Sequence, residues 1–204
     1  MDDLPETIEL TEVSTGSSVV ATVVELTTRF AKQQIDSKWW VLPDVPKRQR
    51  ELENDHHWRW GDRLGKLANN QWHEAVAIQT DDAAVQGAIL YWLNTKSFTD
   101  EELGAVYVEA LATAPHNRPW LMKTPLYRGV GEALLLRAVI QSYNLGLGGR
   151  VNLLAFNDTT LISFYESRGF TIVGYDGTGN EKLPKLELAP DAAQDWLRAE
   201  GYEL

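Results

Sequence analysis

The chain has 204 residues, of which 44% are hydrophobic and 24% charged, and its formal net charge is −10. This composition is ordinary for a globular protein with a buried core, and no apolar run approaches the ~20 residues that a membrane-spanning helix needs. An acidic chain is a poor candidate for binding nucleic acid, because contacts to phosphate supply most of that affinity. The absence of cysteine excludes disulfides, a cysteine nucleophile and thiolate metal sites.

Three further expectations follow from these bulk features. Residues 1–6 are acidic and lack an apolar segment, so they are not a signal peptide, and a cytoplasmic location is expected. The negative charge suits a cationic amine ligand, although solubility alone is the stronger explanation of an acidic surface. No repeat or long linker divides the sequence, so a single domain is predicted over residues 1–204.

The N-terminal third is predicted to hold one strand followed by helices. Residues 7–13 alternate apolar and polar side chains, which is typical of a half-buried strand. Residues 19–34 are expected to form a helix capped by the preceding Thr-Gly-Ser-Ser stretch, despite several β-branched side chains. Residues 48–67 are charged and are also predicted to be helical, with a break near Gly61 or Gly65.

From Trp72 onward the pattern changes to that of a mixed α/β fold. Alternating and β-branched residues predict six strands, at residues 73–79, 85–93, 105–113, 151–156, 170–175 and 185–188. Helical spacing of apolar residues predicts helices over residues 131–143 and 161–168. A last helix is expected to begin at Asp191, directly after Pro190.

A glycine-rich turn, Arg128-Gly129-Val130-Gly131-Glu132-Ala133, lies at the start of the helix predicted over residues 131–143. Glycine lets the backbone approach a ligand closely, and the free N–H groups of a first helical turn favour an anion. The dinucleotide fingerprint is excluded because Leu134 occupies its third glycine position, and the Gly-Lys-Ser/Thr of a P-loop is missing. Taken alone, the turn is either a phosphate site or simply a tight loop.

Two motifs in this order resemble those of the GNAT N-acetyltransferase superfamily. Residues 128–135 are similar to its first motif, Q/R-x-x-G-x-G/A, and Phe164-Tyr165-Glu166-Ser167-Arg168-Gly169-Phe170 is similar to its second, F/L-Y-E-x-x-G-F. The resemblance covers residues 72–188. It implies a GNAT fold, with a central mixed, mostly antiparallel sheet flanked by helices. Residues 1–71 would then supply an N-terminal strand and helices, and residues 189–204 a C-terminal helix.

The resemblance also implies an activity, which is direct transfer of an acetyl group from acetyl-CoA to a primary amine of a small molecule or a protein. No metal is required, and the absence of cysteine agrees with a mechanism that has no covalent enzyme intermediate. The expected partners are acetyl-CoA and the amine, without nucleic acid or membrane, and a homodimer is left open. The cofactor-binding positions that it implies are Thr113, Arg128, Gly129, Val130, Gly131, Glu132, Ala133 and Asn157.

This sequence departs from the family pattern in three places. Leu126 occupies the first motif position, where Gln or Arg is usual, so one side-chain contribution to the phosphate site is lost. The usual asparagine seven residues before the tyrosine falls on Asp158, with Asn157 beside it. The segment from Pro115 to Arg128 is several residues longer than the usual loop, and it either forms a wall of the cleft or is a neutral insertion.

Two residues are the candidates for proton transfer. Tyr165 matches the family tyrosine that protonates the leaving thiolate, and a phenol with a pKa of ~10 can serve as that acid. Glu109 lies four residues before Thr113, so a regular strand places both on one face, and Glu109 is the candidate base. Tyr165 could instead be a core aromatic residue, and Glu109 an ordinary strand residue, with a water chain taking the proton.

Several features leave alternatives open. The tryptophans of the first third could line an amine pocket or simply pack the core. His56 and His57 are adjacent, which is poor geometry for holding a metal ion, and no metal site is predicted. Leu126 and the uncertain base motivate a second function, a non-catalytic module that binds acetyl-CoA and regulates a partner. A third, a toxin that modifies aminoacyl-tRNA, is disfavoured by the net charge of −10.

Overall fold

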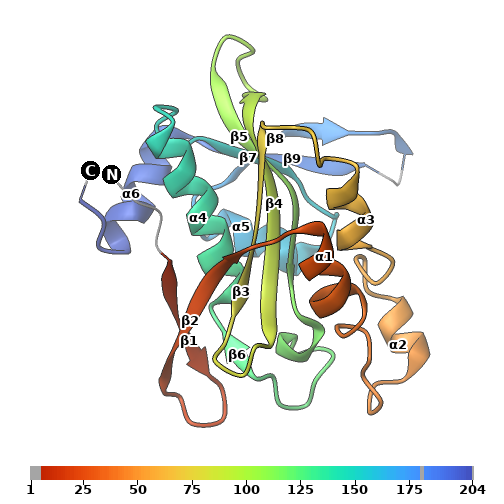
Figure 1. Ribbon diagram of the computed structural model, residues 1–204. Helices are drawn as coiled ribbons and strands as arrows, with labels where there is room; N and C mark the ends of the chain where they lie inside the picture. Colours follow the sequence, from red (N-terminus) through yellow and green to blue (C-terminus); the bar gives the residue numbers. More distant parts are fainter. Residues whose placement is uncertain (1–5, 180–181, 204) are drawn as a thin grey trace. The chain divides into compact units, whose positions relative to one another are not determined.

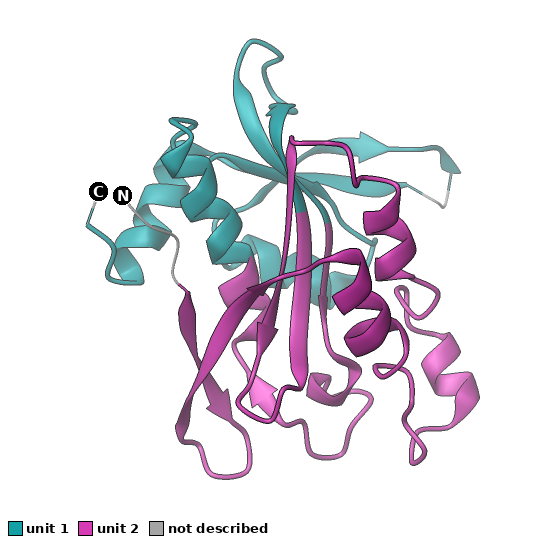
Figure 2. Ribbon diagram, viewed as in Figure 1, with its two compact units in different colours: residues 1–4, 91–109, 135–204 teal, residues 5–90, 110–134 magenta. Residues whose placement is uncertain are grey.

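The structure is a computed structural model that describes residues 6–179 and 182–203. Residues 1–5, on which the expectation about a signal peptide largely rests, lie outside the described residues. The chain divides into two compact units, the first containing residues 91–109 and 135–204 and the second residues 5–90 and 110–134 (Figure 2). The prediction of one domain over residues 1–204 stays a prediction.

The described residues form the mixed α/β fold that the sequence predicts, with groups of strands and groups of helices following one another along the chain (Figure 1). The strands are β1 (Thr7–Glu12), β2 (Ser18–Glu25), β3 (His73–Gln79), β4 (Val85–Lys96), β5 (Gly104–Thr113), β6 (Tyr127–Arg128), β7 (Val151–Leu154), β8 (Thr171–Asp176) and β9 (Leu183–Leu188). The helical elements are α1 (Thr28–Ala31), the π-helical turn η1 (Lys32–Asp36), α2 (Lys47–Glu51), α3 (Trp60–Gly65), the 3-10 turn η2 (Pro115–Asn117), α4 (Val130–Asn144), α5 (Thr159–Glu166) and α6 (Pro190–Ala199).

Hydrogen-bonded neighbours in the sheet follow the order β6-β1-β2-β3-β4-β5-β7-β9-β8. The β1–β2, β1–β6, β2–β3, β7–β9 and β8–β9 pairs are antiparallel, whereas β5 and β7 are parallel. The expected mixed, mostly antiparallel sheet is therefore confirmed. The short strand β6 was not predicted, because a two-residue strand carries no periodic pattern. It ties the residues just before the glycine turn to β1.

The helix predicted over residues 19–34 is wrong in its first half. Residues 18–25 form strand β2, whose four valines and one threonine favour extended backbone because branching at Cβ restricts the side chain in a helix. Helical structure begins only at Thr28, where the Thr27 hydroxyl accepts a hydrogen bond from the Phe30 N–H at 3.2 Å. The N-terminal strand is thus a hairpin of β1 and β2.

The helix predicted over residues 48–67 is also corrected. It consists of two short helices, α2 and α3, and the break lies between Glu51 and Trp60 rather than at the glycines. Asp36 accepts hydrogen bonds from the N–H groups of Trp60 and Gly61, at 2.8 and 2.9 Å. This distant carboxylate caps α3 in place of a local cap residue, which sequence reasoning could not anticipate.

The second unit has its own hydrophobic core, built between the N-terminal helices and the sheet. Apolar residues from α1, η1 and α3 pack with residues of β3, β4 and β5, and the large buried members include Ile35, Trp39, Trp60, Leu64 and Leu90. Trp39 and Trp60 meet edge to face at 6.3 Å, and the Trp39 indole N–H donates to the Val85 carbonyl at 3.1 Å. For Trp39 and Trp60, packing rather than a ligand pocket is therefore the observed role.

The first unit contains a buried carboxylate that joins several strands and is called here the Glu187 cluster (Glu187, Ser97, Phe98, Thr99 and Arg150). Glu187, on β9, is 2% exposed and accepts from the Ser97 hydroxyl at 2.7 Å and the Phe98 N–H at 2.6 Å. It also accepts from the Thr99 hydroxyl at 3.1 Å and from Arg150 at 2.8 Å. The cluster fastens the loop after β4 to β9 and to the residue that precedes β7.

No helix in the described part of the chain has the length and apolar character needed to cross a membrane.

Candidate functional site

The glycine turn begins helix α4 with an open backbone. Gly129 has a φ of +88°, which favours glycine, and no atom lies within 4 Å of the position that a Cβ would take. The first hydrogen bond of the helix runs from the Ala133 N–H to the Gly129 carbonyl at 2.9 Å. The N–H groups of Val130 and Gly131 come before it, so no helical carbonyl is available to them. This arrangement fits an anion such as a pyrophosphate.

Close packing against the sheet fixes the start of α4 in place. A Cβ on Gly87 of β4 would lie 2.5 Å from Cγ1 of Val130 and 2.9 Å from Cδ1 of Leu134. Only glycine therefore allows this approach without a shift of one of the two elements. On the other side of the turn, Arg128 is exposed and pairs through its backbone with Thr11 of β1.

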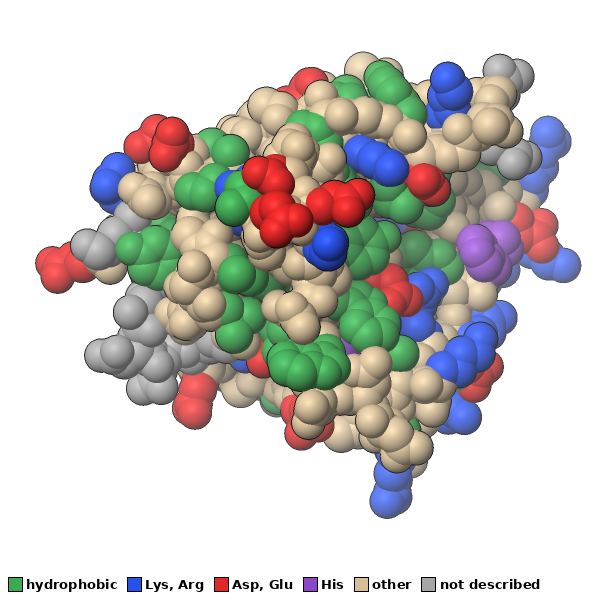
Figure 3. Space-filling model, turned by 90° about the horizontal axis from the view of Figure 1, so that it is seen from above, with side chains coloured by type: hydrophobic (Ala, Val, Ile, Leu, Met, Phe, Trp, Pro, Cys, Tyr) green, Lys and Arg blue, Asp and Glu red, His purple; other side chains and the backbone are tan. Residues whose placement is uncertain are grey.

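Apart from the N–H groups at the start of α4, the surface charge of the protein does little to attract an anion. Acidic and basic side chains are interspersed with apolar ones on the face shown in Figure 3. Because the chain as a whole carries a charge of −10, the long-range field opposes an anionic ligand. A cofactor with phosphate groups would have to be held by donors close to it.

The end of strand β5 is held by a buried arginine. Nε and Nη2 of Arg118 donate to the Thr113 carbonyl at 3.2 and 2.8 Å. The next N–H, that of Ala114, donates to the Gln86 carbonyl at 2.8 Å. The peptide between Thr113 and Ala114 is therefore held at both its oxygen and its nitrogen.

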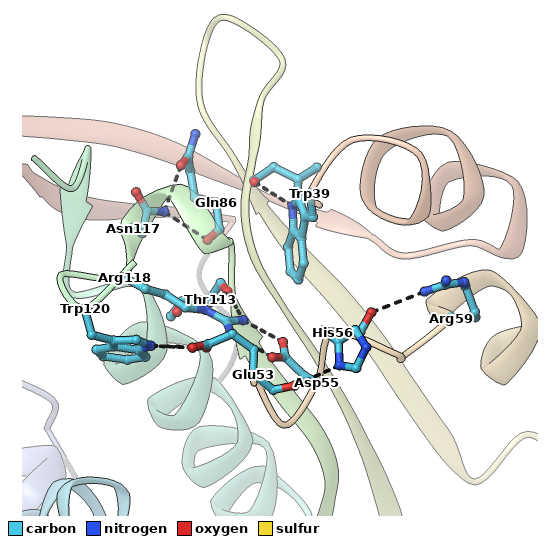
Figure 4. Close-up of polar contacts among 11 residues, drawn as sticks. Trp39, Glu53, Asp55, His56, Arg59, Gln86, Thr113, Asn117, Arg118 and Trp120 are labelled. Atoms are coloured by element: carbon cyan, nitrogen blue, oxygen red, sulfur yellow. Dashed lines mark hydrogen bonds and ion pairs between the residues drawn. The ribbon is translucent and has the colours of Figure 1, made fainter. Parts of the chain in front are cut away.

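Two carboxylates hold the same arginine from the other side (Figure 4). Nη1 and Nη2 of Arg118 donate to the two oxygens of Asp55 at 2.7 and 2.5 Å, and Nη1 also donates to Glu53 at 2.7 Å. The group is called here the Arg118 cluster (Arg118, Glu53, Asp55 and the Thr113 carbonyl). Burial lowers the pKa of Arg118, but Asp55 and then Glu53 outweigh it, so the pKa is raised and the guanidinium stays charged.

A second polar network holds the loop that follows β5. The side-chain oxygen of the fully buried Gln86 accepts from Nδ2 of Asn117 at 3.0 Å and from Nε2 of His116 at 2.8 Å. Oδ1 of Asn117 accepts from the Tyr127 N–H at 3.0 Å, which ties the two ends of the loop together. Burial lowers the pKa of His116 despite the attraction of Asp82, and Arg118 lowers it further. The imidazole is thus neutral near pH 7.

Glu109 lies on the half-exposed face of β5. Burial alternates along the strand, with Tyr107, Glu109, Leu111 and Thr113 half-buried and the residues between them buried. The alternation in burial expected from the even spacing of Glu109 and Thr113 is therefore present. The Trp92 indole N–H donates to Oε2 of Glu109 at 2.6 Å, and this partner was not predicted.

Tyr165 is a buried residue of α5. It is 5% exposed, and its ring meets those of Phe164 and Phe170 edge to face at 5.2 and 5.5 Å. Burial raises the pKa of the Tyr165 phenol, so the hydroxyl is protonated at all ordinary pH values. Tyr165 is thus packed as a core aromatic residue would be, and its hydroxyl remains protonated.

Residues 157 and 158 take different places at the start of α5. Asp158 is the N-cap of the helix, and its side chain accepts from the Leu161 N–H at 2.9 Å. Asn157 precedes the cap and is exposed. The position of the usual family asparagine is therefore occupied by a capping carboxylate, while the adjacent Asn157 is at the surface.

The histidine pair is packed among aromatic rings. The rings of His56 and His57 lie 5.7 Å apart at an interplanar angle of 75°, and His56 also meets Trp40 at 6.4 Å. Within residues 6–179 and 182–203, no three His, Asp or Glu side chains are grouped so that they could hold a metal ion.

The predicted site residues fall into two sets. Thr113 and residues 128–133 belong to the second unit, and Glu109, Asn157 and Tyr165 belong to the first. Sequence reasoning missed Arg118, Glu53 and Asp55. A cation next to Pro119 in the long loop was a weak signal for Arg118, but nothing in the sequence linked it to carboxylates more than sixty residues earlier.

Neither the family models nor the curated protein sequences include a significant match to this chain. Solved structures do match it. A spermidine N-acetyltransferase SpeG chimera from Vibrio cholerae and hSSAT is 12% identical, with 86% of this chain and 98% of that chain covered and a TM-score of 0.58. PaiA N-acetyltransferase from Thermoplasma acidophilum, solved with coenzyme A, is 14% identical, with 83% and 98% covered and a TM-score of 0.52. A putative GNAT-family acetyltransferase from Bordetella pertussis is 11% identical, with 91% and 100% covered and a TM-score of 0.54. At identities this low, the likeness shows the fold.

Proposed function

We propose that this chain, which has the fold of the GNAT acetyltransferases, is an acetyl-CoA-dependent N-acetyltransferase that acts on a primary amine. The observation that carries the proposal is the start of α4, where Gly129 leaves open space beside a backbone with N–H groups that precede the first helical hydrogen bond. PaiA N-acetyltransferase, a protein of the same fold, was solved in complex with coenzyme A, which supports this assignment of the ligand.

The cofactor would be held mainly by backbone groups. The N–H groups of residues 129–131 would donate to the pyrophosphate, and Arg128 would add a positive charge beside them. The expected contact from Ala133 is corrected, because the Ala133 N–H already donates to the Gly129 carbonyl. Because the side chain of Leu126 cannot donate a hydrogen bond, this turn depends more on its backbone than the family pattern does. Asn157 is the proposed side-chain contact at the start of α5.

Acetyl-CoA, when bound, supplies an acetyl group that is activated as a thioester. The Thr113 N–H would donate to the acetyl carbonyl oxygen and so stabilise the negative charge that develops there. The Arg118 cluster supports this role, because it fixes the carbonyl of the same residue and therefore limits rotation at the end of β5. A donor that is already oriented stabilises charge without having to reorganise.

Glu109 is the proposed base. It would accept the proton that the amine loses as its nitrogen attacks the acetyl carbon, either directly or through water. The hydrogen bond from Trp92 to Oε2 restricts the carboxylate to one orientation, which suits a group that must meet a proton at a defined place.

Tyr165 is the proposed acid, which would give its phenolic proton to the departing sulfur. Burial raises the pKa of this phenol, which by itself weakens an acid. The same buried surroundings would raise the pKa of a thiol beside it, so donor and acceptor shift in the same direction and the proton transfer stays feasible.

A cationic polyamine is the acceptor we propose to test first. Neighbours of the same fold are named spermidine N-acetyltransferases, and the net charge of −10 favours a cationic ligand over an anionic one. A protein amino group is the second acceptor class, represented by a lysine-containing peptide.

The test is release of free coenzyme A from acetyl-CoA in the presence of spermidine or the peptide. A thiol reagent reports this release directly, because the chain contains no cysteine of its own. Tyr165→Phe keeps the packed ring, and we expect it to lower kcat about a hundredfold or more while the free energy of unfolding changes little. Tyr175→Phe, at a tyrosine that is 54% exposed, is the matched control and should leave kcat unchanged.

Other outcomes would contradict specific parts of the proposal. Binding of acetyl-CoA without turnover on any amine would favour the non-catalytic module over the enzyme. Failure to bind acetyl-CoA at all would overturn both. Full activity of Tyr165→Phe would remove the acid role from Tyr165 while leaving the transferase function in place.

A further inference from the structure

A hollow in the second unit lies beside the glycine turn. It has a volume of about 530 Å³ and is lined by Val13, Asn117, Pro119, Lys123, Thr124, Pro125 and Arg128. Arg128 is bonded directly to Gly129, so the hollow begins where the proposed pyrophosphate site ends. Its volume falls within the ~300–1,000 Å³ typical of small-molecule sites and exceeds what a single phosphate group needs.

The hollow carries positive charge that the protein leaves uncompensated. Lys123 and Arg128 both line it, and neither takes part in an ion pair of the described residues. No carboxylate is among the lining residues. Both side chains are exposed, so their charges are available to an anionic ligand although the chain as a whole carries a charge of −10.

Nearby carboxylates face the other way. Glu12 is paired with Tyr127 across the β1–β6 ladder, whereas Arg128 is paired with Thr11. Because successive residues of a strand point to opposite faces, Glu12 lies with Tyr127 and away from Arg128. Glu12, Asp81 and Asp82 act on Tyr127, where they reinforce the effect of burial in raising its pKa. The strand therefore separates an acidic face from the face that bears Arg128.

The loop that supplies most of the hollow is held at its base. Asn117 joins the start of the loop to Gln86 and to the Tyr127 N–H at its end, with distances of 3.0 Å in both cases. The Leu126 N–H donates to the His116 carbonyl at 3.2 Å. Lys123 and Thr124 are thus carried on a segment with fixed ends, which is the part of this chain that exceeds the usual family loop.

We propose that this hollow binds the 3′-phosphate of coenzyme A, with Lys123 and Arg128 as its cationic contacts. The inference rests on the proposed function, since it assumes that the cofactor pyrophosphate lies at residues 129–133. The 3′-phosphate is the one remaining phosphate of the molecule, and it sits on the ribose next to the pyrophosphate. Thr124 and Asn117 add hydrogen-bonding groups that suit the ribose and phosphate oxygens.

Calorimetric binding of two ligands tests the proposal, namely acetyl-CoA and acetyl-dephospho-CoA, which lacks only the 3′-phosphate. We expect the unmodified chain to bind acetyl-CoA about tenfold more tightly than acetyl-dephospho-CoA. Lys123→Ala should weaken the binding of acetyl-CoA several-fold and leave the affinity for acetyl-dephospho-CoA unchanged. Lys66→Ala removes the same charge from an exposed site elsewhere in the unit and should change neither affinity.

Three results would overturn the proposal. The first is that the unmodified chain binds acetyl-CoA and acetyl-dephospho-CoA with equal affinity. The second is that Lys123→Ala weakens the binding of both ligands by the same factor. The third is that Lys66→Ala weakens the binding of acetyl-CoA as much as Lys123→Ala does. Adenosine 3′,5′-bisphosphate should compete with acetyl-CoA, and inorganic phosphate at the same concentration should not. Failure of the unmodified chain to bind either ligand would instead contradict the proposed function itself.

Discussion

Each of the two units contains a buried cluster of arginine and carboxylate, and the two clusters are built in opposite ways. The Arg118 cluster has a cation at its centre, with two carboxylates and one backbone carbonyl around it. The Glu187 cluster has an anion at its centre, with one arginine, two hydroxyls and one backbone N–H around it. Both centres are almost completely buried, with Arg118 5% exposed and Glu187 2% exposed.

The difference indicates what each cluster is for. The groups around Glu187 come from the loop after β4 and from the residue before β7, and none of them is a predicted site residue. The Arg118 cluster instead grips Thr113, whose N–H is the proposed donor to the acetyl carbonyl. We therefore expect damage to the Glu187 cluster to reduce stability, and damage to the Arg118 cluster to reduce the reaction rate.

The largest effect is expected from Glu187→Gln, which keeps the shape of the side chain and removes its charge. Arg150 then loses its ion-pair partner, and breaking a buried pair in this way costs about 3–5 kcal/mol. Urea denaturation should report this loss in the free energy of unfolding. Glu101→Gln, at a carboxylate whose side chain is 86% exposed, should cost less than about 1 kcal/mol. Acetyl transfer per folded molecule should be unchanged in both variants.

Arg118→Lys should have a smaller effect on stability and a larger one on catalysis. Lysine keeps the charge but cannot donate to Asp55, Glu53 and Thr113 at once, because it lacks the planar fork of arginine. We expect a loss of about 2 kcal/mol in the free energy of unfolding and a fall of about tenfold in kcat.

Two measurements make that prediction decisive. The KM for acetyl-CoA should be nearly unchanged, because the proposed pyrophosphate contacts of residues 129–131 are not touched. Arg198→Lys, at an exposed ion pair with Asp195, serves as the control and should alter neither quantity. If Arg118→Lys loses stability but keeps its full kcat, the cluster is structural only, like that of Glu187.

Acidification should affect the two units in different pH windows. The pKa of His116 is lowered from 6.5, mainly by burial, so its contribution to stability is complete above pH 6.5 and is lost as the pH falls through the lowered value. Burial raises the pKa of Glu187, but hydrogen bonds from Ser97, Phe98, Arg150 and Thr99 lower it further than burial raises it. Its contribution is present above its ordinary value of 4.5 and is lost as the pH falls through the lowered one.

These losses should appear as two steps in the free energy of unfolding measured between pH 7 and pH 3. His116→Gln should remove the first step and leave the second, while Glu187→Gln should do the reverse. A single step that neither substitution shifts would contradict the assignment of both groups. Because each proton uptake removes only part of a residue's contribution, either step should be smaller than the effect of Glu187→Gln.

Most strands could be predicted from the sequence because their side chains follow a regular period. The structure has β3 at the predicted residues 73–79, and it extends β5 by one residue relative to the prediction of 105–113. The valine-rich β2 was missed because the Thr-Gly-Ser-Ser stretch before it was interpreted as a helix cap, whereas those residues form the turn of a hairpin. Local signals of this kind fit both a cap and a turn, and only pairing with β1 decides between them.

The candidate site likewise contains residues that could be predicted from the sequence and residues that could not. The turn at residues 128–133 could be predicted because its chemistry is local, a glycine at positive φ followed directly by a helix. Arg118 could not, because its partners Glu53 and Asp55 are more than sixty residues away along the chain. The contact from Trp92 to Glu109 crosses between two strands and is likewise invisible to a pattern along the sequence.

The smallest predicted effect tests how far the Arg118 cluster extends. Trp120 is 60% exposed, and its indole N–H donates to the two oxygens of Glu53 at 3.0 and 3.1 Å. Trp120→Phe removes this donor and keeps most of the ring, so the free energy of unfolding should fall by less than about 1 kcal/mol. Because Glu53 keeps its contact with Arg118, the Thr113 carbonyl should stay in place and kcat should stay within about twofold. A fall in kcat as large as that of Arg118→Lys would mean that the exposed indole, and not only the buried guanidinium, sets the position of Thr113.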